Sequence, residues 1–337
     1  MITRRMLLAS AFALAAITPA AGAQAQAQSQ AQAQAQAADY PAKGSVLKYV
    51  VPFPPGGLTD VMARLVGQQL SEGLGVTVVV ENRPGAGAMI GAEQVSRAAP
   101  DGNTLLAITM THSVNATLLR DRSRFDITKD LKPVALLAST PILVVVPANS
   151  TIRTLDDLAK AAKGKELNAG SSGVGTPSHL SLALFNQING TNILHIPYAG
   201  GAPSLTDLMG GQLDVIFSNY AESLPYVQSG KLRAIAIASA ARNPQVPNVP
   251  TSAEAGMPKL NVEQWTAVML PAATPDAIVQ RLGKELVSIM ARPEVAEKTR
   301  SLGFSVDARG PAEFAPFWNS EVQRWRALIE SAGITAQ

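Results

Sequence analysis

The fold is decided by residues 46–60, which read VLKYVVPFPPGGLTD. The stretch opens with Val46–Val51, a short apolar run typical of a strand buried on both faces of a parallel sheet. A Pro/Gly turn follows, and the amphipathic segment from Asp60 to about Ser71 predicts a helix. Strand, tight turn and helix in this order begin a βαβ unit, so the stretch predicts an α/β protein with a mostly parallel sheet.

The same alternation of strand and helix repeats along most of the chain. We expect strands at 76–80, 104–109, 141–146, 167–169, 193–197, 215–218, 232–238 and 262–270. We expect further helices at 88–98, 156–163, 177–188, 204–210, 275–290 and 311–329. One series ends near residue 147 and a second returns near residue 250, which predicts two doubly wound lobes. Lobe 1 would comprise residues 39–146 and 251–337, and lobe 2 residues 147–250.

The first 38 residues differ in composition from the rest. Residues 1–23 combine Arg4 and Arg5 with a short apolar run and small residues, which is typical of an export signal cleaved near Ala23. The paired arginines loosely resemble a twin-arginine signal, but the general secretory (Sec) route is favoured over the twin-arginine (Tat) route. Residues 24–38 are an Ala/Gln repeat that predicts a disordered tether. The mature protein is therefore expected outside the cytoplasm.

Charge and cysteine usage exclude several classes of function. The net charge is +3 for the whole chain, and +1 without the two arginines of the signal. A nearly neutral protein lacks the basic footprint of a nucleic-acid binder. The absence of cysteine excludes disulfides, thiol catalysis and cysteine-ligated metals. We expect no metal and no cofactor.

The first of four notable loops follows the opening strand. Residues 52–60 contain Gly56 and Gly57, which let a ligand approach the main chain. Thr59 is expected to be the N-cap of the next helix, whose free N–H groups and dipole would attract an anion. The alternative interpretation is a stiff structural turn.

The second and third loops also follow predicted strands. Residues 83–88 read RPGAGA, but the spacing of their glycines differs from the dinucleotide motif, leaving ligand contact or a tight turn. Residues 170–179 read GSSGVGTPSH, with Thr176 as expected N-cap and Pro177 as first helical residue. Thr176 stands where a phosphate loop has lysine, so a nucleotide site is not expected. Hydroxyl and N–H donors at a helix start suit a carboxylate.

The fourth loop, residues 197–201, repeats the Pro-aromatic and Gly-Gly features of the first. Tyr198 and Phe53 are expected to cover the ligand with apolar surface, with the Tyr198 hydroxyl as a donor. Either residue is otherwise an ordinary core aromatic.

The histidines argue against catalysis. His112 and His179 fall at loop or helix starts of the same expected cleft, whereas His195 lies inside a strand and is expected to be structural. A hydrolase would need Ser172 or Ser178 as nucleophile with His179 as base, but no third residue to orient that histidine is evident. We therefore expect a binding protein and not an enzyme.

Together the loops resemble those of the Bug receptors, the substrate-binding proteins of tripartite tricarboxylate transporters. The resemblance covers nearly the whole mature chain. It rests on residues 51–57 with Asp60 and Arg64, and on residues 81–87, 100–102, 173–176 with His179, 207–214, 229–234, and 250–251 with 254–256.

The resemblance implies a two-lobed periplasmic binding protein fold of type II-like topology. It implies that the first and third loops grip one carboxylate, with Thr109 to His112 at the cleft. The lobes would close by hinge motion, and the closed form would dock on membrane transporter subunits. We expect a monomer. The ligand-binding residues expected are Phe53, Gly56, Gly57, Thr59, Asp60, Gly87, Met89, Thr109, His112, Ser171, Ser172, Gly173, Gly175, Thr176, His179, Tyr198, Ser218 and Asn219.

The sequence departs from the family pattern at several positions near the cleft. Ala199 stands where the family commonly has a basic residue, Ala183 near a usual acid, and Ala88-Met89 in place of a Gly-rich pair. The missing basic residue argues against a highly charged ligand such as citrate. We expect a mono- or dicarboxylate with an apolar or aromatic body, contacted by Met89 and Tyr198. A sensor of the same fold that serves a signalling partner remains an alternative.

Overall fold

The computed structural model describes residues 40–239 and 241–336. The expected signal and Ala/Gln tether lie outside these residues. The strands are β1 Val46–Val51, β2 Thr77–Asn82, β3 Thr104–Thr109, β4 Leu131–Pro147, β5 Asn168–Ser171, β6 Leu194–Pro197, β7 Val215–Asn219, β8 Leu232–Ile237, β9 Glu263–Pro271 and β10 Ser305–Arg309. The α-helices are α2 Leu58–Leu74, α3 Met89–Ser96, α4 Met110–Leu118, α5 Leu155–Gly164, α6 Pro177–Asn189, α7 Gly201–Met209, α8 Tyr220–Gln228, α9 Asp276–Met290, α10 Pro293–Ser301 and α11 Pro311–Ser331. Short 3₁₀ turns are η1 Ala86–Ala88 and η2 Arg120–Arg122.

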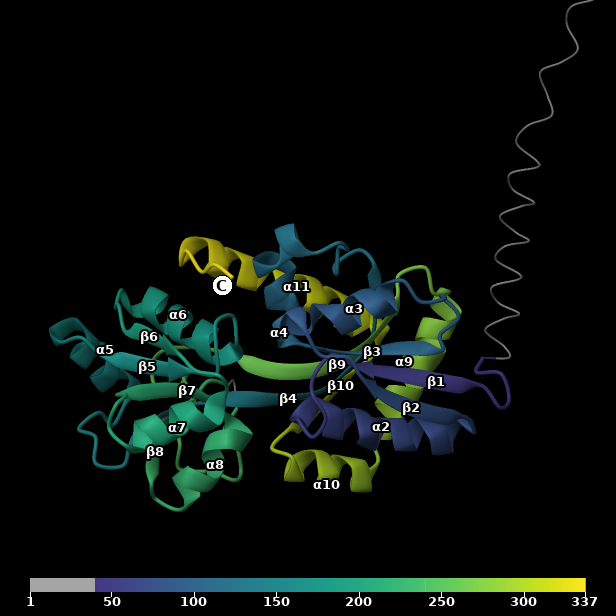
Figure 1. Ribbon diagram of the computed structural model, residues 1–337. Helices are drawn as coiled ribbons and strands as arrows, with labels where there is room; N and C mark the ends of the chain where they lie inside the picture. Colours follow the sequence, from purple (N-terminus) through teal and green to yellow (C-terminus); the bar gives the residue numbers. More distant parts are fainter. Residues whose placement is uncertain (1–39, 240, 337) are drawn as a thin grey trace, which may run out of the picture.

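Two sets of parallel strands are joined by antiparallel ones. The sheet order is β2-β1-β3-β9-β4-β7-β5-β6, with β8 and β10 also paired to β4. In the first lobe β1 is parallel to β2 and β3, and in the second β5 is parallel to β6 and β7. β4 and β9 run antiparallel, side by side, from one lobe into the other (Figure 1). The two-lobed α/β fold expected from the sequence is confirmed.

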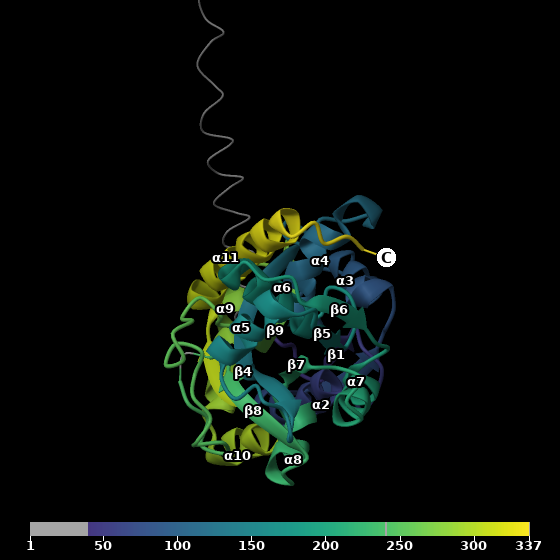
Figure 2. The ribbon, with the colours of Figure 1, turned by 90° about the vertical axis from the view of Figure 1, so that its left-hand side faces the viewer.

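Helices cover both faces of each lobe. α3, α4 and α11 lie above the first lobe's sheet, and α2 and α10 lie below it (Figure 1, Figure 2). In the second lobe, α5 and α6 pack in one apolar cluster while α7 and α8 pack in another. Among the described residues, no helix is long and apolar enough to cross a membrane.

The connecting strand β4 is longer than the sequence indicated. Only 141–146 was expected, yet the strand begins at Leu131. Its first half contains Pro133 and ends before Pro141, and proline normally interrupts a strand. The pairing with β9 shifts register twice, at Pro133/Ala135 and Leu136/Ala138, and the first of these bulges accommodates the missing N–H of Pro133.

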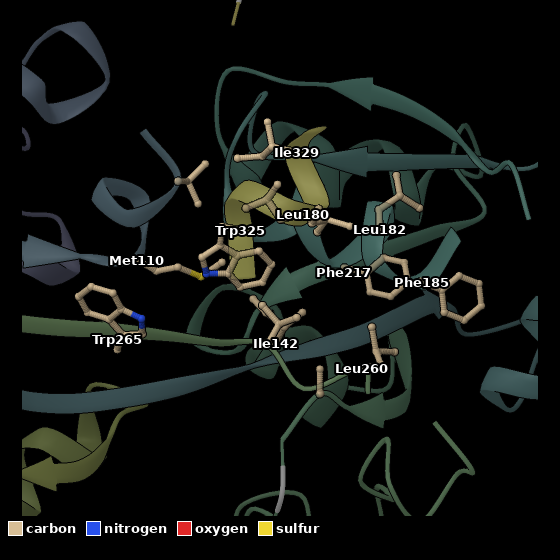
Figure 3. Close-up of a cluster of buried hydrophobic side chains, with 14 of the residues drawn as sticks. Met110, Ile142, Leu180, Leu182, Phe185, Phe217, Leu260, Trp265, Trp325 and Ile329 are labelled. Carbon is tan, nitrogen blue, oxygen red and sulfur yellow. The ribbon is translucent and has the colours of Figure 1, made fainter. Parts of the chain in front are cut away.

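One apolar cluster extends through both lobes. Trp325 and Ile329 of α11 lie beside Leu180 of α6, and the cluster continues to Phe185 and Phe217 (Figure 3). The two phenylalanine rings are 5.5 Å apart. Because the C-terminal helix packs against the second lobe, the two lobes share a core on this side.

A buried glutamate anchors α11 to the connecting strand β9. Oε2 of Glu321 accepts the indole N–H of Trp265 at 3.0 Å and that of Trp325 at 2.9 Å. Both tryptophans are almost completely buried, so this one oxygen satisfies two donors that water cannot reach.

Candidate ligand-binding site

The first loop is held in place by Asp60. Its buried carboxylate accepts hydrogen bonds from the Gly56 N–H at 2.9 Å, from Arg64 Nε at 3.0 Å and from Asn82 Nδ2 at 2.9 Å. Burial alone would raise the pKa of Asp60, but these bonds outweigh it and hold the pKa below its usual value. Asp60 therefore fixes the shape of the first loop through hydrogen bonds to Gly56, Arg64 and Asn82.

The expected N-cap at Thr59 is wrong. α2 starts at Leu58, its N-cap is Gly57, two residues before Thr59, and no side chain caps it. A glycine N-cap is tolerated here because Asp60 bonds back to the Gly56 N–H and closes the turn.

The second loop has a constrained backbone and is held by α4. Ala86, Gly87 and Ala88 all have positive φ, at 46°, 63° and 74°. Asn115 Nδ2 donates to the Gly87 carbonyl at 2.6 Å. Two alanines in the left-handed region within three residues are uncommon, which marks this turn as a place where the fold imposes a particular backbone shape.

His112 belongs to the helix that follows β3. Its Nδ1 accepts the Thr109 N–H at 3.1 Å, forming a capping box, and its ring meets Phe53 edge-on at 6.0 Å. Burial lowers the pKa of His112 to about 4, against a smaller opposing effect from the backbone of Thr109 and Ala88. The ring is therefore neutral near pH 7 and joins the first loop to α4.

The third loop forms the expected helix start. The Thr176 hydroxyl accepts the His179 N–H at 3.5 Å and donates to the Gly173 carbonyl at 2.7 Å, and Pro177 is the first helical residue. Both assignments are confirmed. Gly173 and Gly175 have φ of +125° and +75°, and the Gly175 N–H donates to His179 Nδ1 at 3.2 Å. The loop is thus wrapped around the N-terminus of α6.

His195 contributes to this loop, although its place in a strand suggested only a structural role. Its ring stacks on that of His179, with centroids 3.7 Å apart and planes 7° apart. Its Nε2 is hydrogen-bonded to Ser171 Oγ at 2.5 Å. Burial lowers the pKa of both histidines, that of His179 to about 4 with help from the neighbouring His195. His195 positions Ser171 and His179.

The fourth loop does not present its tyrosine hydroxyl as expected. Tyr198 Oη donates to Asp207 Oδ2 at 2.7 Å, and this bond raises the tyrosine pKa to about 12. The Tyr198 hydroxyl therefore already donates its hydrogen bond to a residue of α7. At the end of β7, Ser218 Oγ donates to the Asn219 carbonyl, and Asn219 Nδ2 donates to Glu222 Oε1 at 3.1 Å.

A cavity of about 520 Å³ lies where the lobes meet beside the second and third loops. Its lining is Ala86, Gly87, Met89, Thr111, Asn115, Leu118, Leu119, Arg122, Ser123, Val174, Gly175, Thr176 and Ala336. Four expected site residues line it: Gly87, Met89, Gly175 and Thr176. The other expected residues, including those of the first loop and Tyr198, do not. α4 forms much of the wall, although the sequence pattern does not predict this helix.

The arrangement favours binding an anion over catalysis. Ser178 is the second residue of α6, where a backbone N–H has no acceptor within the helix. The helix dipole adds partial positive charge at this point. No described carboxylate is hydrogen-bonded to His179 or His195, and the described residues contain no group of three metal-ligating side chains.

The buried histidines predict a loss of stability in mild acid. Their unfolded pKa is about 6.5, and in the folded protein those of His112 and His179 lie near 4. The unfolded chain therefore binds more protons between these values. The contribution of the two histidines to the free energy of unfolding should be complete above pH 6.5. It should fall as the pH drops towards 4, by up to about 1.4 kcal/mol per pH unit for each histidine.

Denaturant unfolding at pH 7.5, 6.5, 5.5 and 4.5 measures this slope, with His112→Gln and His179→Gln each expected to reduce it. Burial raises the pKa of Glu263, which acts in the opposite sense, but this contribution cancels between variants. Equal slopes in the wild type and in both variants would contradict the assignment.

The profile described as tripartite tricarboxylate transporter family receptor matches residues 62–334. The chain belongs to this family. Members are periplasmic solute-binding proteins, so the protein is a receptor and not an enzyme, and the hydrolase alternative falls away.

Individual relatives agree with the family assignment. The receptor is 34% identical to protein BugT of Bordetella pertussis, over 88% of this chain and 91% of that one. It resembles the structure of MatC from Rhodopseudomonas palustris with bound malate, at a TM-score of 0.71 and 32% identity, covering 86% of this chain and 100% of that one. It also resembles Rpa4515 of the same organism with adipate, at a TM-score of 0.73 and 32% identity, covering 88% and 99%.

Proposed function

We propose that this receptor captures a small organic carboxylate between its two lobes and delivers it to a tripartite tricarboxylate-type transporter in the membrane. The ligand is a mono- or dicarboxylate with an apolar or aromatic body. One carboxylate binds at the third loop, through the backbone and hydroxyl groups of residues 171–179. Lobe 1 comprises residues 39–146 and 251–337, and lobe 2 residues 147–250.

The observation that carries the proposal is the contact between the α6 start and α4 at the cavity. A Cβ atom placed on Gly175 would lie 2.7 Å from Leu118 Cδ1 and 3.8 Å from Val114 Cγ1, so the anion-binding loop is in direct reach of the other lobe. Met89 and Leu118 give the cavity an apolar wall beside the loop. A ligand that contacts both sides stabilises the closed arrangement. The similar structures with malate and adipate support the carboxylate class.

We also propose how the receptor is exported and in which oligomeric state it works. The chain is exported by the general secretory route, is cleaved near Ala23 and works as a periplasmic monomer. The composition of residues 1–23 supports the export step.

Thermal unfolding of the mature protein against a panel of carboxylates tests the function. The panel contains aliphatic and aromatic mono-, di- and tricarboxylates, with amino acids and sugars as comparison. A ligand at 100 times its dissociation constant should add about 2.7 kcal/mol of stability. A selective shift with mono- or dicarboxylates is expected. No shift with any carboxylate, or a shift with sugars alone, would reject the proposal.

A further inference from the structure

The wall of the cavity carries a positive charge. Among the described residues that line the cavity, only Arg122 has a charged side chain. Its Nη2 donates to the carbonyl of Ala336 at 3.3 Å, and Ala336 lines the cavity too. The guanidinium itself, and not only the backbone of Arg122, therefore lies at the cavity edge, where the segment that follows α11 passes beside α4 (Figure 1, Figure 2).

The turn that carries Arg122 is fixed to α4. The Arg122 N–H donates to the Leu119 carbonyl at 3.0 Å, and the Leu119 N–H donates to the Asn115 carbonyl at 3.0 Å. The 3₁₀ turn η2 therefore continues directly from the end of the helix. Arg122 thus belongs to the first lobe's side of the cavity, whereas Gly175 and Thr176 of the third loop line it from the second lobe.

The charge of Arg122 is not opposed by an acid in the cavity wall. No described residue that lines the cavity has a carboxylate side chain. The adjacent Asp121 is 97% exposed, pairs with Arg120 at 3.9 Å and does not line the cavity. The lining also includes the apolar side chains of Met89 and Leu118. A ligand with an apolar body would therefore meet a cation here and no like charge.

A guanidinium is well suited to a carboxylate. Its N–H donors form a planar fork that matches the two carboxylate oxygens, and bonds between charged partners are stronger than a bond to a neutral carbonyl such as that of Ala336. Arg122 is exposed, so its charge stays hydrated in the ligand-free receptor and carries no cost of burial. A ligand carboxylate would replace the Ala336 carbonyl as the acceptor.

We propose that Arg122 is a specificity-determining residue that binds a second carboxylate of the ligand, so that the receptor prefers dicarboxylates to ligands with one carboxylate. The first carboxylate binds at the third loop, and the second binds the guanidinium in place of the Ala336 carbonyl. This inference rests on the proposed function, because it assigns the other end of the same ligand.

Matched ligand pairs test the inference. Succinate, glutarate, adipate, suberate and terephthalate are each compared with their monoamides, which keep the length and replace one carboxylate by a neutral group. Affinities are measured by calorimetry with the mature protein. We expect the wild type to bind at least one diacid about tenfold or more tightly than its monoamide, because one charge-assisted contact is gained.

Two variants make the comparison sharp. Arg122→Gln should reduce the ratio to about twofold or less, while its affinity for the monoamide stays within about threefold of the wild type, because the site of the first carboxylate is untouched. Arg120→Gln removes the same charge from the same turn, at a side chain that is 70% exposed and does not line the cavity. This control should keep the wild-type ratio.

The outcomes separate the inference from the proposed function. Equal affinities within every pair for the wild type, or the wild-type ratio in Arg122→Gln, would overturn the inference and leave carboxylate binding intact. An equal loss in Arg120→Gln would also overturn it, because the effect would then come from the charge of the whole turn. Binding of other carboxylates but of neither member of any pair would do the same. If no carboxylate binds the wild type, both the inference and the proposed function fail.

Discussion

Gly175→Val will abolish the stabilisation of the protein by its carboxylate ligand, with affinity reduced at least 100-fold, or about 2.7 kcal/mol. Gly175 has a φ of +75°, where a β-branched residue is strained, and its new methyl groups would meet Leu118 and Val114 of α4. The loop must then shift, and its N–H bond to His179 is lost. Thermal shift and calorimetric titration with the carboxylate found in the panel measure the effect.

The matched control lies at the other end of the same helix. Gly190, the C-cap of α6, has a φ of +60° and nothing within 4 Å of a Cβ atom. Gly190→Val should cost a similar backbone strain of about 1–3 kcal/mol while leaving ligand affinity unchanged. If Gly175→Val binds the carboxylate as tightly as Gly190→Val, the third loop is not the binding loop.

Glu321→Ala will lower the free energy of unfolding by about 3–5 kcal/mol. The substitution leaves the indole N–H groups of Trp265 and Trp325 buried without an acceptor, because one oxygen serves both. Denaturant unfolding followed by tryptophan fluorescence measures the change.

Two controls distinguish the lost acceptor from a general effect on α11. Glu321→Gln retains an oxygen able to accept both bonds and should lose at most about 2 kcal/mol. Glu313→Ala, at an exposed position of the same helix, should stay within about 0.5 kcal/mol of the wild type. If the free energy of unfolding of Glu321→Ala lies within about 1 kcal/mol of the wild-type value, water must reach the two indole N–H groups.

The sequence predicted the parts of the fold that follow local rules. The strand at Thr104–Thr109 and the start of α6 at Thr176 and Pro177 were found because hydrophobic runs and capping residues act over a few neighbours. Helix α4 was missed because its polar residues interrupt the apolar pattern, although Thr109 and His112 have the spacing of a capping box. The first half of β4 was missed because Pro133 signals a break that the bulge beside it absorbs.

The interactions between loops could not be read from the chain. His195 reaches Ser171 and His179 because β6 lies beside β5 in a register that pairs it with Ala169, and no motif reports that register. The bond from Arg122 to the Ala336 carbonyl likewise joins residues far apart in the chain. Candidate residues were predictable where a loop follows a strand, but their partners depend on tertiary structure.

The position of β9 also governs the order in which the protein can be completed. β9 lies between β3 and β4, so the first lobe lacks an internal strand until residue 271 has been synthesised. The first lobe is therefore the first to be synthesised in part and the last to complete its sheet. The chain leaves the ribosome, or crosses a membrane, with its amino end first. The edges of β3 and β4 that later pair with β9 would therefore stay unpaired for most of this time. Such edges invite aggregation, so we expect the nascent protein to depend on chaperones until its last fifth emerges.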